Sequence, residues 1–404
     1  MKTIACLSLL LLIIGCQQEV EKTVRKFDRD RDGMLLIEGK RTFMIGTYHL
    51  PKSDSPYRTL RENGYNLIHV PANLEALDAA QENGLYTWLG TGSLRKKNQA
   101  EDEKRIKTVI TRFKEHPSLL LWEIADEPAF TWHSPDYRVS PEQMIKTYQL
   151  IKKEDPDHLV YTNHGPVNLI STLRKYNAAT DIIACDIYPV IPHGIKPTYA
   201  LFDDGLQGDL LNPYLSQVGE YTDKMMQVSE GNLPLFMVLQ GFSWEMLKDE
   251  KDRDMQMILY PTYEQSRFMA YNAIIHGATG INYWGTSYTP QPSPFMESLN
   301  RLTRELAEMQ AVLAAPVKET AISKEYHEMG HSIDTGVEYL AKEAGGVFYL
   351  LTANADKNPV KVTFSGLKNF SEAIVLKENR KIEIKSGSFT DDYQRFDVHV
   401  YQFE

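Results

Sequence analysis

The stretch HPSLLLWEIADEPAF, at residues 116–130, determines how the rest of the chain is interpreted. Its apolar run ends after Ala125 in two adjacent carboxylates, Asp126 and Glu127, followed by a proline. A short, continuous apolar run is typical of a strand that is buried on both faces, as in a parallel sheet. Two neighbouring carboxylates at the end of such a strand repel each other and lose hydration, which costs free energy. We therefore expect them to be functional rather than structural.

The same kind of apolar run recurs along most of the chain. Short apolar runs, rich in β-branched or aromatic residues, alternate with polar stretches that have helical periodicity. The eight runs are TFMIGTY, YNLIHVP, LYTWLG, LLLWEIA, HLVYTN, DIIACDIYP, PLFMVLQGF and GINYW. Eight β/α units over roughly 270 residues predict an α/β fold, a TIM (β/α)8 barrel over residues 44–316.

The texture changes on both sides of this region. Beyond Pro316 the chain consists of short segments with a period of two and Gly or Asn between them, which predicts a small antiparallel β-sandwich domain over residues 317–404. Residues 17–43 are interpreted as a linker and a β-turn segment, because Gly33 can bend the chain between FDRDRD and MLLIEGK.

The first sixteen residues, MKTIACLSLLLLIIGC, differ from the rest. One Lys precedes an apolar run that is shorter than the roughly 18 to 20 residues of a transmembrane helix. The segment resembles a bacterial lipoprotein signal, with residues 13–16 as its lipobox. The resemblance implies that residues 1–16 form a signal peptide, that Cys16 is lipidated, and that the protein is lipid-anchored in the bacterial cell envelope, on the outer membrane, facing the periplasm or the outside. Cys185, in an apolar run, is expected to be a buried thiol.

The balance of charge excludes some classes of partner. The chain of 404 residues has 44 basic and 54 acidic residues and a formal net charge of −10. No tract is rich in Lys or Arg, so we expect neither nucleic acid nor an anionic membrane surface as a partner, and contact with a membrane only through the lipid. We expect no cofactor and no resident metal ion.

The stretch HPSLLLWEIADEP resembles the fourth-strand signature of clan A glycoside hydrolases, a Trp-bearing strand that ends in Asn-Glu-Pro. The similarity extends to NGYNLIHVP at the second strand, to GATGINYW at the eighth, and to a C-terminal β domain ending in VHVY. The resemblance implies a glycoside hydrolase that acts on an oligo- or polysaccharide, with Glu127 as general acid/base. It also implies that Trp284 takes the place of a sugar-stacking Trp. The sugar, its linkage and the mode of cleavage are not specified by these residues.

Two positions depart from the pattern of the clan. Asp126 stands where the clan has an Asn, and Gln240 stands where the seventh strand has its nucleophilic Glu. A neutral amide cannot form the glycosyl ester of a retaining enzyme. Four explanations remain open. Glu245, five residues further on, could be the nucleophile; Asp186, at the end of the sixth strand, could be the general base of an inverting reaction; the pair Asp126-Glu127 could serve a substrate-assisted mechanism; or the barrel could be catalytically inactive and bind glycan only.

Polar and aromatic residues also follow other strands of the predicted barrel. The carboxyl ends of barrel strands form the active-site face, so side chains there are candidates for substrate binding. Aromatic rings with scattered hydrogen-bonding groups suit a sugar, which has apolar faces and polar edges. Besides Asp126, the candidates are Tyr48, His49, Asn163, His164, Tyr188, Gln240, Trp244 and Trp284.

The sequence HEMGH, at residues 327–331, offers a rival function. It matches the H-E-x-x-H motif of zinc proteases, in which two His side chains one helical turn apart bind the metal. The motif requires a helix, yet this copy runs into Gly330 and strand-like residues. The longer metzincin pattern would need Gly and His where the chain has Asp334 and Val337. We therefore keep a zinc metalloprotease as the less favoured alternative.

Overall fold

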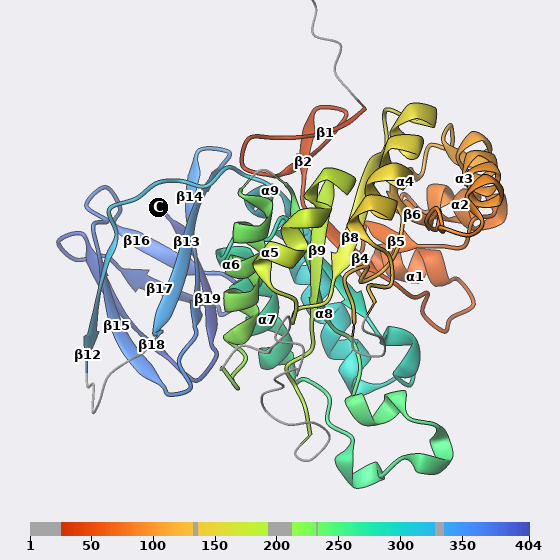
Figure 1. Cartoon of the computed structure of the whole chain (residues 1–404). Coiled ribbons are helices and arrows are strands. Elements are labelled where there is room, and N and C mark those ends of the chain that lie inside the picture. Colours follow the sequence, from red (N-terminus) through yellow and green to blue (C-terminus); the bar gives the residue numbers. More distant parts are fainter. Residues whose placement is uncertain (1–25, 132–135, 193–211, 232, 328–334) are drawn as a thin grey trace, which may run out of the picture.

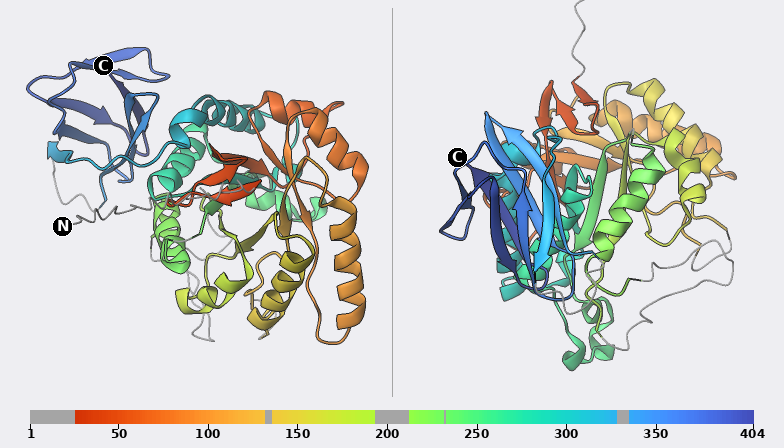
Figure 2. Two further views of the ribbon diagram at one scale, coloured as in Figure 1. Left: turned by 90° about the horizontal axis from the view of Figure 1, so that it is seen from above. Right: turned by 90° about the vertical axis from the view of Figure 1, so that its left-hand side faces the viewer.

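The computed structural model describes residues 26–131, 136–192, 212–231, 233–327 and 335–404, and Figure 1 shows the arrangement of their elements. A barrel occupies the centre of the chain, a small sheet lies at one end of it, and an all-β domain packs at its side (Figures 1 and 2). The predicted segment 1–16, with Cys16, lies outside the described residues.

A closed barrel of eight parallel strands confirms the predicted fold class. Neighbouring strands follow chain order around the ring, and the last strand pairs with the first. Each predicted apolar run contains one of them. The strands are β4 (Met44–Thr47), β5 (Leu67–His69), β6 (Tyr86–Gly90), β7 (Leu119–Glu123), β8 (Leu159–His164), β9 (Ile182–Ile187), β10 (Leu235–Gln240) and β11 (Gly280–Trp284).

Helices surround the barrel (Figure 2). They are α1 (Pro56–Glu62), α2 (Leu74–Glu82), α3 (Gln99–Phe113), α4 (Pro141–Glu154), α5 (Ile170–Leu173), α6 (Gln217–Ser229), α7 (Tyr263–Ile275), α8 (Pro294–Glu308) and α9 (Gln310–Leu313). Helix α4 begins with a capping box between Ser140 and Gln143, with Pro141 at its first position, as its sequence predicts. Within the described ranges, no helix combines the length and the apolar character that a membrane span requires.

A three-stranded sheet closes the amino end of the barrel. It consists of β1 (Phe27–Arg29), β2 (Leu35–Ile37) and β3 (Lys40–Thr42), with Gly33 in the left-handed region at the turn between β1 and β2. Apolar side chains of this sheet, Phe27 and Leu35 among them, belong to the same core cluster as inward residues of the barrel strands. The red strands therefore lie within the ring of barrel elements when the molecule is seen from above (Figure 2). With this end plugged, only the carboxyl ends of the strands remain for a site.

The C-terminal domain consists of two antiparallel sheets, which confirms the predicted β-sandwich. One sheet has the order β12 (Ser323–His327), β15 (Val360–Ser365), β18 (Ser388–Tyr393). The other has the order β13 (Val337–Ala344), β14 (Val347–Asn354), β19 (Val398–Phe403), β16 (Glu372–Val375), β17 (Arg380–Glu383). Aromatic and aliphatic side chains from both sheets, such as Phe364 and Tyr401, form its separate core.

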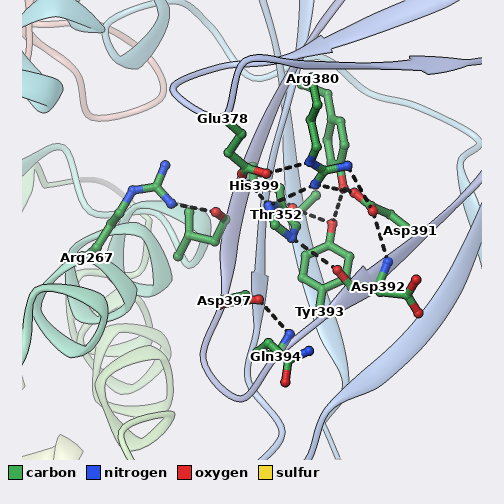
Figure 3. Close-up of polar contacts among 12 residues, drawn as sticks. Arg267, Thr352, Glu378, Arg380, Asp391, Asp392, Tyr393, Gln394, Asp397 and His399 are labelled. Atoms are coloured by element: carbon green, nitrogen blue, oxygen red, sulfur yellow. Dashed lines mark hydrogen bonds and ion pairs between the residues drawn. The ribbon is translucent and has the colours of Figure 1, made fainter.

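A polar network ties three strands of this domain together (Figure 3). The Arg380 guanidinium donates two hydrogen bonds to Asp391, at 3.0 and 2.8 Å, and one to Glu378 at 2.7 Å. The Tyr401 hydroxyl donates to the same Asp391 carboxylate at 2.7 Å, and His399 contacts Glu378 at 2.5 Å. Because the charges are paired and hydrogen-bonded, the network can be largely buried.

The sandwich is fastened to the barrel through helix α7. His276, which follows α7, lies 2.9 Å from Asp223 of α6 and 2.9 Å from Glu338 of β13. Asn272 donates a further hydrogen bond to Glu338 at 2.8 Å. Burial opposes the charge of the ring, but the hydrogen bonds to Asp223 and Glu338 prevail and raise the pKa of His276 to about 10. The interface thus contains an ion triad that is present only while His276 is protonated.

We predict that His276→Gln lowers the free energy of unfolding by about 2 kcal/mol at pH 6, the range of a hydrogen bond to a charged group. Because the folded pKa of about 10 lies above the ordinary value, the contribution is fully present below about pH 6.5 and is lost as the pH rises through 10. Chemical denaturation of both proteins at pH 6 and above pH 10 measures it. A difference that is equal at both pH values would contradict the triad.

Candidate active site

Glu127 is held in an unusual backbone conformation at the carboxyl end of β7. Its φ angle is +43°, in the left-handed region that residues other than glycine rarely adopt. The backbone N–H of Glu127 donates to the carbonyl of Asn163 at 3.0 Å, and its own carbonyl accepts from Phe130 at 3.0 Å. The neighbouring strand β8 therefore fixes where the Glu127 side chain points. Such constrained residues cluster at functional sites.

Carboxyl groups from two strands meet at this point. The Asn163 amide nitrogen donates to Asp126 at 3.0 Å and to Asp186 at 3.3 Å, and so links the ends of β7, β8 and β9. The Glu127 carboxyl also interacts with Asp186, whose hydrogen bond is one of the contacts that lower the pKa of Glu127. An ionised carboxylate has no hydrogen to donate, so this contact requires a proton on one of the two.

Burial is the largest cause of an altered pKa in this group. It raises the pKa of Glu127 to about 7, with a further rise from the Asp126 charge, and Arg138 opposes both effects. The Arg138 guanidinium donates to Glu127 at 2.9 Å and lies 4.3 Å from the centre of the Phe130 ring. Burial, followed by the charges of Glu127 and Asp126, also raises the pKa of Asp186 well above its ordinary value. The pair therefore keeps a proton near neutrality.

Glu123 is a fourth carboxyl group, which the sequence reasoning missed. It lies inside β7, is buried, and accepts a hydrogen bond from the Trp88 indole at 3.2 Å. Burial and the nearby Asp126 charge raise the pKa of Glu123 to about 8. A period of two places Glu123 on the same side of the strand as Leu121, toward the barrel axis, and Trp122 on the helix side. The alternation of inward and outward side chains along β7 is the sequence signal that could have identified Glu123.

Aromatic rings form a cluster next to the carboxyl groups. Tyr188 and Trp284 are stacked with their ring centres 5.7 Å apart, and Phe242 packs edge-on against both. The Trp244 indole donates to the Tyr188 carbonyl at 3.2 Å. Tyr288, 43% exposed and 5.6 Å from Trp284, extends the cluster toward solvent. The structure thus brings together three predicted aromatic residues and adds Phe242 and Tyr288, which follow strands β10 and β11 and were not singled out.

The predicted residues Tyr48 and His49 follow β4 and pack against other aromatic rings of this region. The Tyr48 hydroxyl is 2.8 Å from that of Tyr161, and its ring packs edge-on against Trp88 at 5.0 Å. His49 lies 6.1 Å from Trp284. His69, at the end of β5, was missed and lies 5.4 Å from Trp88. These rings surround the inner part of the barrel mouth.

Gln240, which the sequence predicts to bind substrate, has its side-chain amide engaged in hydrogen bonds to backbone groups. Its amide oxygen accepts from the Val190 N–H at 2.9 Å, and its amide nitrogen donates to the carbonyls of Val190 at 2.9 Å and of Phe242 at 3.1 Å. The side chain is fully buried. Gln240 therefore fastens the segment after β9 to the end of β10.

Glu245 likewise has its carboxylate engaged in other bonds. Its buried carboxylate pairs with Lys248 at 2.9 Å and accepts from the Asp254 N–H at 2.6 Å. These bonds, the Lys248 bond first, lower the pKa of Glu245. The segment that contains these residues follows β10, carries short 3-10 helices and projects from the barrel (Figure 1). The structure does not bring Glu245 to Glu127.

His164, which the sequence predicts to bind substrate, has no side-chain surface exposed to solvent. The ring is fully buried, packs against Tyr176 at 5.8 Å, and has its pKa lowered to about 4 by burial. His164 is thus a neutral core residue.

The rival zinc motif does not begin in a helix. His327 is the last residue of β12, and its ring contacts the Thr363 hydroxyl at 2.7 Å. Residues 328–331 of the motif lie outside the described residues. Among the residues that the structure does describe, no group of His, Cys, Asp and Glu side chains is arranged to hold a metal ion.

Comparisons with known proteins agree with a carbohydrate-active barrel. Residues 33–232 match the family described as glycosyl hydrolases family 2, TIM barrel domain. A β-galactosidase from Clostridium acetobutylicum is 25% identical over 203 residues, which are 50% of this chain and 20% of that protein. The chain thus covers about a fifth of the length of this relative. The family match ends before β10 and does not reach Gln240.

Solved structures show the same fold. A protein described as a glycoside hydrolase superposes with a TM-score of 0.59 at 14% identity and covers 93% of this chain and 96% of its own. A glycoside hydrolase of family 5 from Bacteroides vulgatus has a TM-score of 0.56 at 13% identity, with 93% and 92% covered. Together, the family match and these neighbours support a clan A-like glycoside hydrolase barrel.

We predict that Gln240→Glu destabilises the protein by about 1 to 3 kcal/mol, because a carboxylate cannot donate to the Val190 and Phe242 carbonyls, and that it does not raise glycosidase activity above the native level. Denaturant unfolding and hydrolysis of aryl glycosides measure both effects. Gln81→Glu, an exposed change on α2, is the matched control. Faster hydrolysis by the Gln240 variant would contradict the assignment of Gln240 to a structural role, in which it bonds to the backbone of Val190 and Phe242.

Proposed function

We propose that the protein is a glycoside hydrolase that acts on an oligo- or polysaccharide, with Glu127 as the general acid/base. The observation that carries the proposal is the hydrogen-bonded pair of Glu127 and Asp186, which holds a proton beside a cluster of aromatic rings. Cleavage of a glycosidic bond requires a carboxylic acid that protonates the leaving oxygen. A pKa of about 7 makes Glu127 such an acid near neutrality.

In this proposal neither β10 nor the segment after it supplies the second catalytic group, the nucleophile or general base. Gln240 and Glu245 are both engaged in other bonds. Asp186 touches Glu127, whereas about 5 Å separates the two carboxyl groups of retaining enzymes and about 6.5 Å or more those of inverting ones. The Asp186 hydrogen bond lowers the pKa of Glu127, whereas burial and the Glu127 charge raise the pKa of Asp186, so Asp186 holds the shared proton more readily in the free protein. Asp186 serves as a general base only if substrate separates the pair. Asp126, which reaches solvent beside Glu127, fits a substrate-assisted reaction.

We predict that Glu127→Gln slows hydrolysis of substrates with poor leaving groups by roughly 10²- to 10⁴-fold and of activated aryl glycosides much less. In the native protein, turnover falls as the pH rises through about 7, because the acid form of Glu127 is consumed. Steady-state rates on a matched series of leaving groups measure this. Glu82→Gln, an exposed carboxylate on α2, is the control. Unchanged rates on both classes of substrate would overturn the role of Glu127.

The anomeric configuration of the first product, followed by NMR, distinguishes the partners of Glu127. If the product has the inverted anomeric configuration, and Asp186→Asn abolishes its formation, the result supports a water molecule activated by Asp186. Retention restricted to substrates with a 2-acetamido group, and lost in Asp126→Asn, supports the substrate-assisted route.

A barrel that only binds glycan is the second candidate. It is favoured by one observation, the amide of Gln240 at the place of the usual nucleophile, engaged in backbone bonds. Measurable affinity for a glycan panel without turnover of any member would favour this candidate over the enzyme.

We also propose that the protein is anchored in the bacterial cell envelope through a lipid on Cys16. The proposal rests on the lipobox-like residues 13–16, and the described chain begins at the end of the barrel opposite the candidate site (Figure 1). Such an anchor would present the site away from the membrane.

We predict that Cys16→Ser moves the protein from the membrane fraction to the soluble fraction, because a serine accepts no thioether-linked lipid. Fractionation followed by immunoblotting measures it, with Cys185→Ser as the matched control. A Cys16 variant that stays in the membrane fraction would show that the anchor is something else.

A further inference from the structure

A pocket beside the candidate active site gathers cations around an aromatic ring. Its volume is about 700 Å³, and it lies between the residues that lead into α3 and those that lead into α4. Lys96 and Lys97 come from the first segment, Tyr137 from the second, and Lys175 from the short helix at residues 174–179 that packs beside α4. The three lysines are exposed, whereas Tyr137 is half-buried and packs edge-on against Tyr176 at 6.4 Å.

The charge of this pocket is opposite to that of the whole chain. Its lining has the cations Arg95, Lys96, Lys97 and Lys175 and the anions Asp136 and Glu142, a balance of four to two, while the chain has a formal net charge of −10. Arg95 is paired with Asp102 at 2.8 Å. Within the described part of the chain, Lys96, Lys97 and Lys175 form no ion pair at direct contact distance, although the charges of Lys96 and Lys175 help to lower the pKa of the neighbouring Glu142. A concave surface of one sign concentrates ligands of the other.

The first backbone groups of α4 offer few free donors to an anion. The Gln143 N–H is occupied by the Ser140 hydroxyl in the capping box, and Pro141 has no N–H. Recognition of an anion in this pocket therefore depends on the lysine side chains, which carry mobile point charges with three donors each.

The pocket and the acid are linked through two neighbouring residues of the chain. Tyr137 lines the pocket, and the next residue, Arg138, donates to Glu127 at 2.9 Å. A chain-like ligand held at Glu127 would have to pass this segment to reach the pocket. The Tyr137 ring offers an apolar surface to a sugar ring, and the lysines surround it with donors for a charged substituent.

We propose that this pocket is a subsite for an acidic sugar residue, so that the substrate is a glycan with carboxylate or sulfate groups. The identification of the ligand as a glycan rests on the proposed function; the requirement for an anionic group rests on the three lysines and stands independently of hydrolysis.

The test measures binding by isothermal titration calorimetry, using the full protein. The probes are oligogalacturonates, which carry carboxylates, sulfated galactan oligosaccharides, which carry sulfates, and neutral galacto-oligosaccharides of the same length. The variant Lys96→Gln/Lys97→Gln/Lys175→Gln removes three exposed charges. The matched control Lys104→Gln/Lys146→Gln/Lys153→Gln removes three exposed charges from the outer surfaces of α3 and α4.

We expect at least one acidic probe to bind more tightly than the neutral one, and the pocket variant to lose roughly tenfold in that affinity. The control variant should keep the affinity, and the binding of the neutral probe should not change. The acidic probe that responds identifies carboxylate or sulfate as the recognised group. Equal affinity for acidic and neutral probes, or equal losses in both triple variants, would overturn the subsite. Either result leaves the rates of Glu127→Gln as a separate test of the hydrolase.

Discussion

The candidate site depends on one constraint, the confinement of like charges at the end of a buried strand. Asn163 holds the carboxyl groups of Asp126 and Asp186 at hydrogen-bond distance, and Glu127 contacts Asp186 in turn. In a region of low dielectric these groups cannot all be ionised, so protons are retained at a pH where an exposed carboxyl would have lost them. The left-handed backbone conformation of Glu127 is stabilised by its hydrogen bond to the Asn163 carbonyl of β8. A barrel whose strands were less rigid would relieve the repulsion by moving apart.

The remaining architecture supports this end of the barrel. The small sheet β1–β3 fills the amino end, so that apolar side chains close the interior beneath the carboxyl groups. The C-terminal sandwich packs on α7 through Glu338 and His276, away from the aromatic cluster. Gln240 holds the segment after β9 that carries Tyr188, and thereby positions one ring of the proposed sugar platform. Each contact restricts the freedom of a segment on which the site is built.

Most of the fold could be predicted from the sequence, since it depends on local periodicity. The eight apolar runs became the eight barrel strands, and the period-two segments became the sandwich. The strand ends also located Asp126, Glu127, Asp186, Tyr188 and Trp284, because the carboxyl ends of parallel strands must meet. The spacing of residues in the sequence does not show in which direction a side chain points once its strand has ended. Gln240 and Glu245 each bond to loop backbone, and Arg138 reaches Glu127 from a segment with no strand or helix signal. Glu123 was missed for a different reason, since it lies within an apolar run and only its inward direction reveals it.

The central claim is that burial, reinforced by the charge of Asp126, raises the pKa of Glu127 so that it holds a proton near neutrality. The most direct test is a titration of the Glu127 carboxyl group by carbon-13 NMR, assigned by comparison with Glu127→Gln. The account predicts a pKa of about 7 in the native protein, which falls toward the ordinary value of a glutamate when Asp126 is replaced by Asn. A Glu127 that titrates near its ordinary pKa of about 4.3, and that does not respond to the loss of Asp126, would contradict it.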